Sequence, residues 1–344
     1  MPCYVYPWLR TCFEYGVTQK AQIFVEENGF IRITIPVKFN WTPGQHCFLR
    51  FTSFGLLQTI SAHPFTICSS PSKYPNEQSE LVFYIRHQRG FTAQLYQYAL
   101  QNPGASVPVL VDGPYGGINL KNYNHAEHLL VIAGGSGAGW CLPFIERFLK
   151  QDSIPAGEEH GEGVTPDLKE SAPVVSVHRR NQSSPLSLRV ILATRDISSR
   201  VWFLRTADEL ISKHSATISR PNVHVQVFLT GDAAQEVELL RTPSEDPASS
   251  KLSTSSGEKA DGIEEGPLVT VPGKEFKGRP SLSQIVKEEA TTVASAGEAL
   301  SVFVCGPETM QNDVRNAVAE ENLNILKGSK TGGVYLHSEH FSWA

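Results

Sequence analysis

One nearly apolar stretch, HLLVIAGGSGAGWCLPFIERFL at residues 128–149, limits what this chain can fold into more than any other part of it. Such a stretch can be a membrane-spanning helix, a buried core segment or a phosphate-binding loop. It contains four closely spaced glycines, Gly134, Gly135, Gly137 and Gly139. Each glycine would weaken a spanning helix by roughly 1 kcal/mol, and charged residues at its end would add to that cost within a bilayer. We therefore reject the membrane interpretation.

The remaining composition is typical of a globular protein. A chain of 344 residues can bury a sizeable core and is expected to form two domains. The formal net charge of −5 gives no reason to expect a nucleic-acid partner. The opening MPCYVYPWLRTCFEYG has neither the pattern of a secretory signal nor the roughly 20 apolar residues of a spanning helix. We expect no transmembrane segment in this chain.

The cysteines are scattered along the chain without any CxxC pair, at Cys3, Cys12, Cys47, Cys68, Cys141 and Cys305. This spacing indicates neither a zinc site nor a disulfide framework. We expect free thiols in a reducing compartment and no metal site.

Short strands dominate the chain from Lys20 to Val111. The turn Glu27-Asn28-Gly29 separates AQIFV from FIRITIPV, and Asn-Gly between alternating runs is a strong hairpin signal. Further strands are expected at 45–51, 80–86 and 108–117. One helix is expected in GFTAQLYQYAL, with Thr92 as N-cap and apolar residues at Leu95, Tyr98 and Leu100. This pattern predicts a small antiparallel barrel or sandwich.

The pattern changes after about residue 125. HLLVIAG is the kind of all-apolar strand that is buried on both faces of a parallel sheet. More strands are expected at 188–195, 222–231 and 299–307, with helices at 142–150, 201–214 and 308–322. Strand and helix alternation predicts a doubly wound parallel sheet with helices on both faces.

Two segments, at about 151–187 and 233–276, interrupt this alternation. They are rich in Ser, Pro, Glu, Gly and Lys, so they cannot bury enough apolar surface to offset the entropy of ordering. We predict two disordered insertions and assign them no chemistry. The expected domains are a barrel at 17–122 and an α/β domain at 126–344, with residues 1–16 before them.

The glycine cluster at residues 134–139, which includes Ser136, lies between a predicted strand and a predicted helix. Residues without side chains let the backbone approach a pyrophosphate, and a helix N-terminus offers unpaired N–H donors. A purely structural tight turn is the alternative, because a glycine cluster alone is a weak signal.

Other candidate residues follow strands of the same predicted sheet. Cys305-Gly306-Pro307 stands at the carboxyl end of a strand, where open α/β sheets bind ligands. Arg195 follows another strand, and its guanidinium suits a phosphate. Arg279 precedes a helical run and is counted with the candidate cofactor-binding residues. A buried structural thiol and surface arginines are the alternatives.

The first domain contains two further candidates. HPFTICSSP at 63–71 combines an aromatic ring, a hydroxyl and an imidazole on extended backbone. Arg86 and GFT at 90–92 place a cation near a helix start, which is a possible anion site. Each is, in isolation, compatible with ordinary turn or core packing.

Together these strings resemble the flavin- and NADPH-binding half of the ferric reductase and NADPH oxidase superfamily, and fungal ferric-chelate reductases most of all. The resemblance rests on PGQH, HPFT, IRHQRGFT, GPYG, AGGSGAG and CGPETM, in the family's order, and on the HSEHFSW tail. It implies a ferredoxin–NADP reductase-like fold, in which an FAD-binding antiparallel β-barrel precedes an NADPH-binding α/β domain.

The resemblance also implies a role for each matching residue. The FAD isoalloxazine and ribityl motif is matched by His63, Pro64, Phe65 and Thr66, with Ile67 continuing it. The FAD pyrophosphate segment is matched by Arg86, Phe91 and Thr92. The NADPH pyrophosphate loop is matched by Gly134, Gly135, Ser136, Gly137 and Gly139, with Arg195 expected near the 2′-phosphate. The nicotinamide motif is matched by Cys305, Gly306 and Pro307, and the aromatic tail over the flavin by Phe341 and Trp343. Thr66, Cys305 and Trp343 are the expected catalytic residues.

The implied activity is hydride transfer from NADPH to FAD, followed by single-electron delivery to a ferric or cupric chelate or to a haem. The family is integral to the plasma membrane with this half in the cytosol, so this chain alone is expected to be cytoplasmic or peripheral. Family members carry a membrane domain with haem-ligating histidines, and only about 16 residues precede the flavin domain here. We expect haem only in that missing domain. One departure is Trp140-Cys141, where the family often has a Thr after the glycine loop.

Three alternatives stay open. The module can instead belong to the superoxide-generating oxidase branch, since both branches share these motifs. It can be a non-catalytic fragment that binds cofactor or partner without turnover. The chain itself can be a truncated gene product, an excised domain or a soluble diaphorase.

Overall fold

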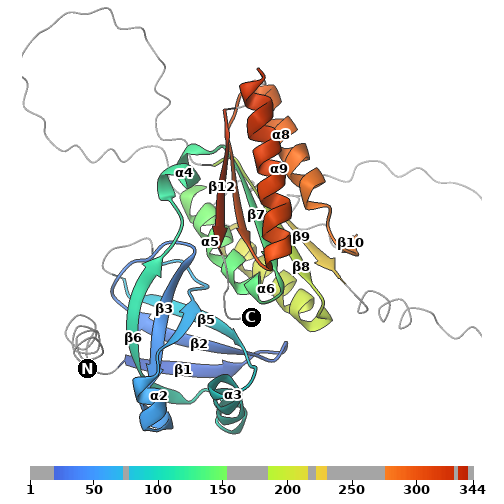
Figure 1. The fold of residues 1–344 in the computed structure, drawn as a ribbon. Helices are drawn as coiled ribbons and strands as arrows, with labels where there is room; N and C mark the ends of the chain where they lie inside the picture. The colour runs from blue at the N-terminus through green and yellow to red at the C-terminus, as the bar shows by residue number, and fades with distance from the viewer. Residues whose placement is uncertain are drawn as a thin grey trace, which may run out of the picture.

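The computed structural model describes residues 19–72, 77–152, 185–215, 222–230, 276–328 and 332–339. Two six-stranded sheets form this part of the chain, an antiparallel one followed by a parallel one (Figure 1). This arrangement confirms the predicted fold class. The predictions for residues 1–16, and for nearly all of the two insertions, fall outside the described residues.

The first sheet has the strand order β4-β3-β6-β1-β2-β5. Its strands are β1 (Gln19–Val25), β2 (Phe30–Val37), β3 (Gln45–Phe51), β4 (His63–Thr66), β5 (Ser79–Arg86) and β6 (Ser106–Gly116). Just beyond β4, the N–H of Cys68 donates to the carbonyl of Val82 in β5, at 2.7 Å. Because β4 and β5 are the two edge strands, this bond closes the sheet into a barrel.

The predicted hairpin joins β1 and β2, with Ile23 opposite Ile33. Gly29 has a φ of 75°, and the side-chain oxygen of Asn28 accepts the N–H of Phe30. Alternate residues of β2, including Ile31, point into the barrel core, as the period of two requires.

Helix α3 (Phe91–Gln101) covers one end of the barrel, beside the short helix α2 (Leu56–Ile60) (Figure 1). The predicted cap was wrong: Gly90, with a φ of 67°, precedes the helix, and Thr92 lies in its first turn. Leu100 is 48% exposed, because the buried face consists of Phe91, Leu95 and Ala99. Helix α2 was not predicted.

The second sheet has the strand order β10-β9-β8-β7-β11-β12, all parallel. Its strands are β7 (His128–Gly134), β8 (Ser187–Thr194), β9 (Val223–Leu229), β10 (Phe276–Lys277), β11 (Leu300–Cys305) and β12 (Val334–Glu339). The chain enters it through the short helix α4 (Leu120–His125). The edge strands β10 and β12 were not predicted.

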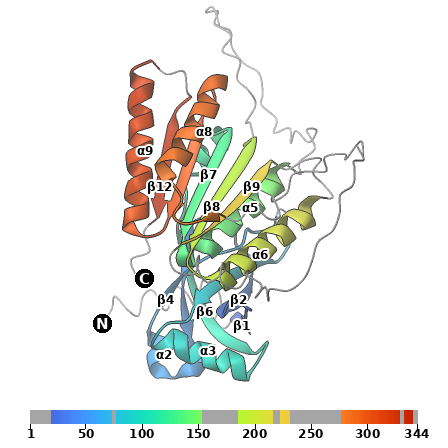
Figure 2. The same ribbon diagram turned by 90° about the vertical axis from the view of Figure 1, so that its right-hand side faces the viewer.

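Helices cover both faces of this sheet (Figure 2). They are α5 (Ala138–Asp152) and α6 (Ile197–Ser215) on one face, and α8 (Leu282–Ala296) and α9 (Glu308–Leu326) on the other. Residues of β7 alternate between the two cores: Leu129 and Val131 pack on the α5 side, whereas Leu130 and Ile132 pack on the α8 side. The apolar look of the opening stretch therefore comes from burial on both faces.

Strand β7 lies at the centre of the sheet, between β8 and β11. The chain runs from β7 to β8 on one side and returns to β11 on the other, so the strand order reverses beside β7. Ligands of open α/β sheets bind at the carboxyl ends of the strands at such a reversal. The fold therefore points to the loops after β7 and β11.

Polar and aromatic contacts join the two halves. Ser70, just after β4, donates its N–H to Glu146 of α5 at 2.7 Å and its hydroxyl to the Pro143 carbonyl at 3.0 Å. Trp202 of α6 packs edge-on against Tyr84 of β5, with ring centroids 4.7 Å apart. These contacts hold the end of β4 against α5, the helix that follows the glycine loop.

Candidate functional site

The loops after β7 and β11 lie against each other. Ala133 and Cys305 are paired at the ends of the two strands. A Cβ placed on Gly134 would stand 3.0 Å from Cδ of Pro307, and one on Gly306 would stand 3.3 Å from N of Gly134. Only glycine allows the two backbones to approach this closely. The two motifs, far apart in the sequence, thus form one surface.

The tip of the glycine loop is open. A short 3-10 turn, Gly135–Gly137, leads into α5, and Gly135 has a φ of 57°. Gly135 and Ser136 are exposed, and a Cβ at Gly135 would meet no atom within 4 Å. The free space lies beside the first N–H groups of α5, which lack helical partners and favour an anion. This geometry fits a pyrophosphate.

Helix α5 begins at Ala138, earlier than the predicted start at Leu142. Ala138, Trp140 and Cys141 are buried with the rest of the helix in one core, so tertiary packing continues the helix back to the loop. Gly139 is therefore a helical residue. It is the second residue of α5, and its role in binding a pyrophosphate stays a prediction.

Gly139 lies where α5 packs closely against the barrel. A Cβ at this position would stand 2.7 Å from Sγ of Cys68 and 3.6 Å from Cβ of Tyr84. Both residues belong to the barrel, so the end of β4 lies one helical turn from the glycine loop. The predicted flavin strand and the predicted dinucleotide loop thus share one side of the molecule.

The flavin-side residues form a stacked cluster on the barrel. The His63 ring stacks on Phe91 with centroids 4.4 Å apart, and Phe65 lies parallel to His63 at 6.4 Å. Burial lowers the pKa of His63, which favours the neutral imidazole. Pro64 is exposed and Thr66 is partly exposed at the strand end. A flat aromatic ring system suits such a surface.

Ile67 does not belong to this surface. Its side chain is 1% exposed in the barrel core, and its N–H donates to the Gln45 carbonyl at 2.9 Å. The Ile67 side chain therefore faces the barrel core, and its role in cofactor binding stays a prediction.

The predicted flavin phosphate segment lies at the start of α3. Arg86 is exposed at the end of β5, one short turn before the helix. The hydroxyl of Thr92 accepts the N–H of Gln88 at 3.0 Å, so Thr92 fixes the connecting turn. Phe91 is buried against Phe51 and links this turn to the barrel core. An exposed cation beside a helix N-terminus fits a second anion.

Two arginines follow the carboxyl edge of the parallel sheet on the β8 side. Arg195 is exposed directly after β8, and Arg279 is exposed between β10 and α8. The ends of these strands are tied together, since Thr230 donates its N–H to the Thr194 carbonyl and Gly278 to the Leu229 carbonyl. Both guanidiniums therefore lie on the same edge as the glycine loop, where a phosphate of a bound dinucleotide could reach them.

The described cysteines, Cys47, Cys68, Cys141 and Cys305, are all free and buried. Burial raises the pKa of the Cys68 thiol to about 12, and burial also raises that of Cys305. Cys305 is therefore a neutral thiol at physiological pH, which disfavours nucleophilic attack. Its side chain is 0% exposed, and its contact with a nicotinamide stays a prediction. Its Sγ would stand 3.8 Å from a Cβ on Gly137.

Several predicted residues cannot be placed. Phe341 and Trp343, in the aromatic tail, lie outside the described residues.

The structure adds residues that sequence reasoning missed. Met310 packs against Gly134 and Gly306, and its place in CGPETM could have indicated it. Ser70 and Gln311 carried no recognisable signal, because an isolated Ser or Gln predicts nothing about its partners.

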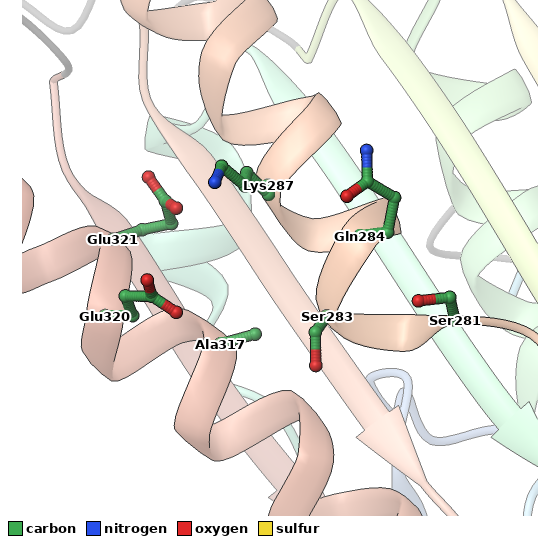
Figure 3. Close-up of a pocket in the computed structure, with 7 residues that line it drawn as sticks. All are labelled: Ser281, Ser283, Gln284, Lys287, Ala317, Glu320 and Glu321. Atoms are coloured by element: carbon green, nitrogen blue, oxygen red, sulfur yellow. The ribbon is translucent and has the colours of Figure 1, made fainter.

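A separate groove lies between α8 and α9 (Figure 3). It is lined by Ser281, Ser283, Gln284, Lys287, Ala317, Glu320 and Glu321. None of these residues belongs to the glycine loop or to the loop after β11, so the groove is not part of the candidate site. Among the described helices, none is both long and apolar enough to cross a membrane.

Each half of the chain matches a known family model. Residues 126–319 match the family model of the ferric reductase NAD binding domain, and residues 16–119 match that of an FAD-binding domain. FAD and a nicotinamide dinucleotide are therefore the cofactors of these two domains.

Curated relatives and solved structures agree with this match. The chain is 24% identical to ferric/cupric reductase transmembrane component 7 of Saccharomyces cerevisiae, over 98% of this chain and 49% of that protein. It is 27% identical to ferric reductase transmembrane component 6 of the same yeast, over 85% of this chain and 33% of that protein. The chain thus spans less than half the length of either relative. The CS-b5R domains of human Ncb5or share the fold at 14% identity, with a TM-score of 0.50 over 94% of this chain and 69% of that one.

Proposed function

Since the chain belongs to the family of the ferric reductase NAD binding domain, we propose that it is an NADPH-dependent flavoprotein reductase module. It takes hydride from NADPH onto FAD and passes single electrons to a ferric or cupric chelate or to a haem. One observation carries this proposal: the packing of Gly139 on Cys68 places the His63–Thr66 strand beside the glycine loop and Cys305. A flavin on the first surface would lie next to a nicotinamide on the second.

The chain's own residues would position the two cofactors. The partly exposed rings of His63 and Phe65 would offer the flavin an aromatic surface, with Phe91 packed behind His63, and Thr66 would offer a hydroxyl at the end of β4. The N-terminus of α5 and the loop tip at Gly135 would hold the dinucleotide pyrophosphate. When bound, FAD and NADPH supply the redox chemistry, while the protein contributes orientation and electrostatics.

Preference for NADPH over NADH is proposed to reside in Arg195 and Arg279. Both are exposed cations on the sheet edge where the adenosine end of a dinucleotide would lie. A guanidinium binds a phosphate through two parallel hydrogen bonds, which NADH cannot offer at its 2′ position. Thr66, Cys305 and the tail residue Trp343 are the proposed catalytic residues.

The relatives' names support a proposal for the electron acceptor. Relatives named transmembrane components of ferric or cupric reductases support a metal chelate. The family resemblance supports electron delivery through a haem-bearing membrane half. We propose that this half faces the cytosol, where NADPH is available. The superoxide-generating branch of the superfamily remains the second candidate.

The proposal is tested on the purified chain reconstituted with FAD. We expect the chain to oxidise NADPH with ferricyanide as acceptor, and the loss of NADPH absorbance at 340 nm measures this reaction. Arg195→Ser should raise the KM for NADPH by about tenfold, from the loss of a charge-assisted hydrogen bond, while the KM for NADH stays the same.

A chain that binds FAD but does not oxidise NADPH would contradict the proposed mechanism. A colourless chain that takes up no FAD would instead support the non-catalytic alternative. Oxygen consumption in place of ferricyanide reduction would favour the oxidase branch.

A further inference from the structure

Gln311 is a fully buried polar side chain at the point where β11, α9 and β12 meet. Its exposed fraction is 0%, in the first turn of α9. Its Nε2 donates to the Gly306 carbonyl at 2.8 Å and to the Glu339 carbonyl at 3.0 Å. Both amide hydrogens therefore have a backbone acceptor. A buried amide is costly unless it is hydrogen-bonded, so this arrangement is specific.

The oxygen of the same amide is also used. Oε1 of Gln311 accepts from the Arg315 guanidinium and from the Ser338 hydroxyl, each at 3.1 Å. Arg315 also donates to the Ser338 hydroxyl, at 2.8 Å. The amide is thus held in one orientation, with its NH₂ group toward the two carbonyls.

The two carbonyls lie where the sheet ends. The ladder between β11 and β12 stops at the pair Cys305–Glu339. Gly306 comes next, in the loop that packs against Gly134 of the glycine loop. Gln311 therefore continues the connection between the two strands one step past their last pair. It ties the loop after β11 to the end of β12.

We propose that Gln311 is a positioning residue for the nicotinamide end of the dinucleotide. By holding the Gly306 carbonyl, it sets the path of Cys305-Gly306-Pro307 beside the glycine loop. It also fixes the point at which the chain leaves β12. This inference rests on the proposed function, because it concerns the same site.

The chain contains a matched control for this role. Asn322, also on α9, bridges to the other end of β12: its Nδ2 donates to the Val334 carbonyl at 3.0 Å, and its Oδ1 accepts the Val334 N–H at 3.4 Å. Asn322 thus holds the same two elements together without touching the loop after β11. If the Gln311 amide were merely structural, its substitution should have the same effects as the substitution of Asn322.

The first experiment needs no cofactor. Gln311→Glu keeps oxygens for Arg315 and Ser338 but removes the NH₂ donors, and Asn322→Asp makes the same change at the control position. We measure hydrogen–deuterium exchange of the amides from Gly306 to Gln311. Gln311→Glu should raise their exchange about tenfold, as expected for losing the hydrogen bonds to the Gly306 and Glu339 carbonyls, and Asn322→Asp should leave it unchanged.

The second experiment separates the two ends of the dinucleotide. With FAD bound, stopped-flow reduction of the flavin by NADPH should slow about tenfold in Gln311→Glu, because a small misplacement of reacting groups is costly in rate. The inhibition constant of 2′-phospho-AMP, which carries the adenosine end of the dinucleotide without the nicotinamide, should stay the same. Asn322→Asp should change neither value. Gln311→Met, which is apolar and of similar length, repeats both measurements if the Glu variant folds poorly.

The inference is overturned if both variants lower the melting temperature but leave the exchange at Gly306 and the reduction rate unaltered. It is also overturned if 2′-phospho-AMP binding falls in parallel with the rate, since the effect would then be general. A wild-type chain that does not reduce FAD with NADPH would contradict the proposed function. The exchange experiment would still show whether Gln311 holds the loop after β11 in place.

Discussion

At Gly139 the absence of a side chain allows the two halves of the protein to pack closely against each other. It lies inside α5, where glycine is normally about 1 kcal/mol less favourable than alanine. The structure explains its presence by Cys68, whose Sγ would stand 2.7 Å from any Cβ at this site. Its position next to the glycine loop led to the prediction of a ligand role. The contact that requires a glycine here is with the barrel residue Cys68.

Gly139→Ala should therefore destabilise the protein by about 1–3 kcal/mol, as overpacking does, despite the better helix propensity of alanine. Urea unfolding of the variant measures this loss. The double variant Gly139→Ala with Cys68→Ala removes the clashing sulfur and should recover most of the stability, since the remaining Cβ–Cβ distance of 3.6 Å is ordinary contact. An increase in stability in Gly139→Ala alone would refute the tight packing.

Single residues also show where sequence reasoning stops. The glycine loop and Cys305-Gly306-Pro307 could be predicted to lie together because both follow strands of a parallel sheet. The burial of Gln311 could not be predicted, because it depends on the edge strand β12 and its register with β11. The burial of Ile67 likewise depends on how the barrel closes after β4.

At the scale of elements, Asp196 begins α6. Its carboxylate accepts the N–H of Ser198 and Ser199 and both of their hydroxyls. Burial alone would raise the pKa of Asp196, but these hydrogen bonds outweigh it and hold the pKa below the ordinary 3.8. This cap fixes where the chain turns from Arg195 into the helix.

Asp196→Ala should cost about 1 kcal/mol at pH 7, the usual value for a lost N-cap. A pKa lowered in the folded state adds stability above the unfolded value, and that stability is lost as the pH falls through the folded value. The difference from wild type should thus shrink below about pH 3.8. Urea unfolding at several pH values checks this. Asp196→Asn keeps a capping oxygen and should lose the pH dependence, so an equally pH-dependent Asn variant would contradict the assignment.

Most long elements could be predicted from periodicity, because strands buried on both faces and amphipathic helices leave clear patterns. The strand predicted at 128–134 matches β7 at both ends. Helix α2 and strand β12 could not be predicted so easily. Helix α2 is a single exposed turn with no buried residue, and β12 is an edge strand in which only Val334 is fully buried. Neither leaves the apolar pattern on which such predictions depend.

For the whole molecule, Trp202 makes a large apolar contact between the halves. It is 1% exposed and packs on Tyr84 of β5 and on Phe30 of β2. Its neighbour Phe203 is equally buried, and both residues belong to the core of the parallel-sheet half. Trp202 adds the ring contacts to the barrel, so Phe203 serves as a control for the loss of a large side chain from that core.

Trp202→Ala should lower stability by about 3–5 kcal/mol and uncouple the halves, so that calorimetry shows two transitions in place of one. Phe203→Ala should lower stability by a similar amount while keeping the wild-type number of transitions. If Trp202→Ala also unfolds in a single transition, the halves are held together by other contacts, such as those of Ser70 with α5.

The pairing of β7 with β11 also has a consequence for the order in which the protein is made. The glycine loop leaves the ribosome early, but its neighbour after β11 is synthesised only after β8, α6, β9, β10 and α8. Parallel strands so far apart in the sequence pair slowly, because a long loop must close first. The barrel consists of contacts closer in sequence and can form during translation. We therefore expect the dinucleotide surface to assemble after the barrel, which precedes it in the sequence.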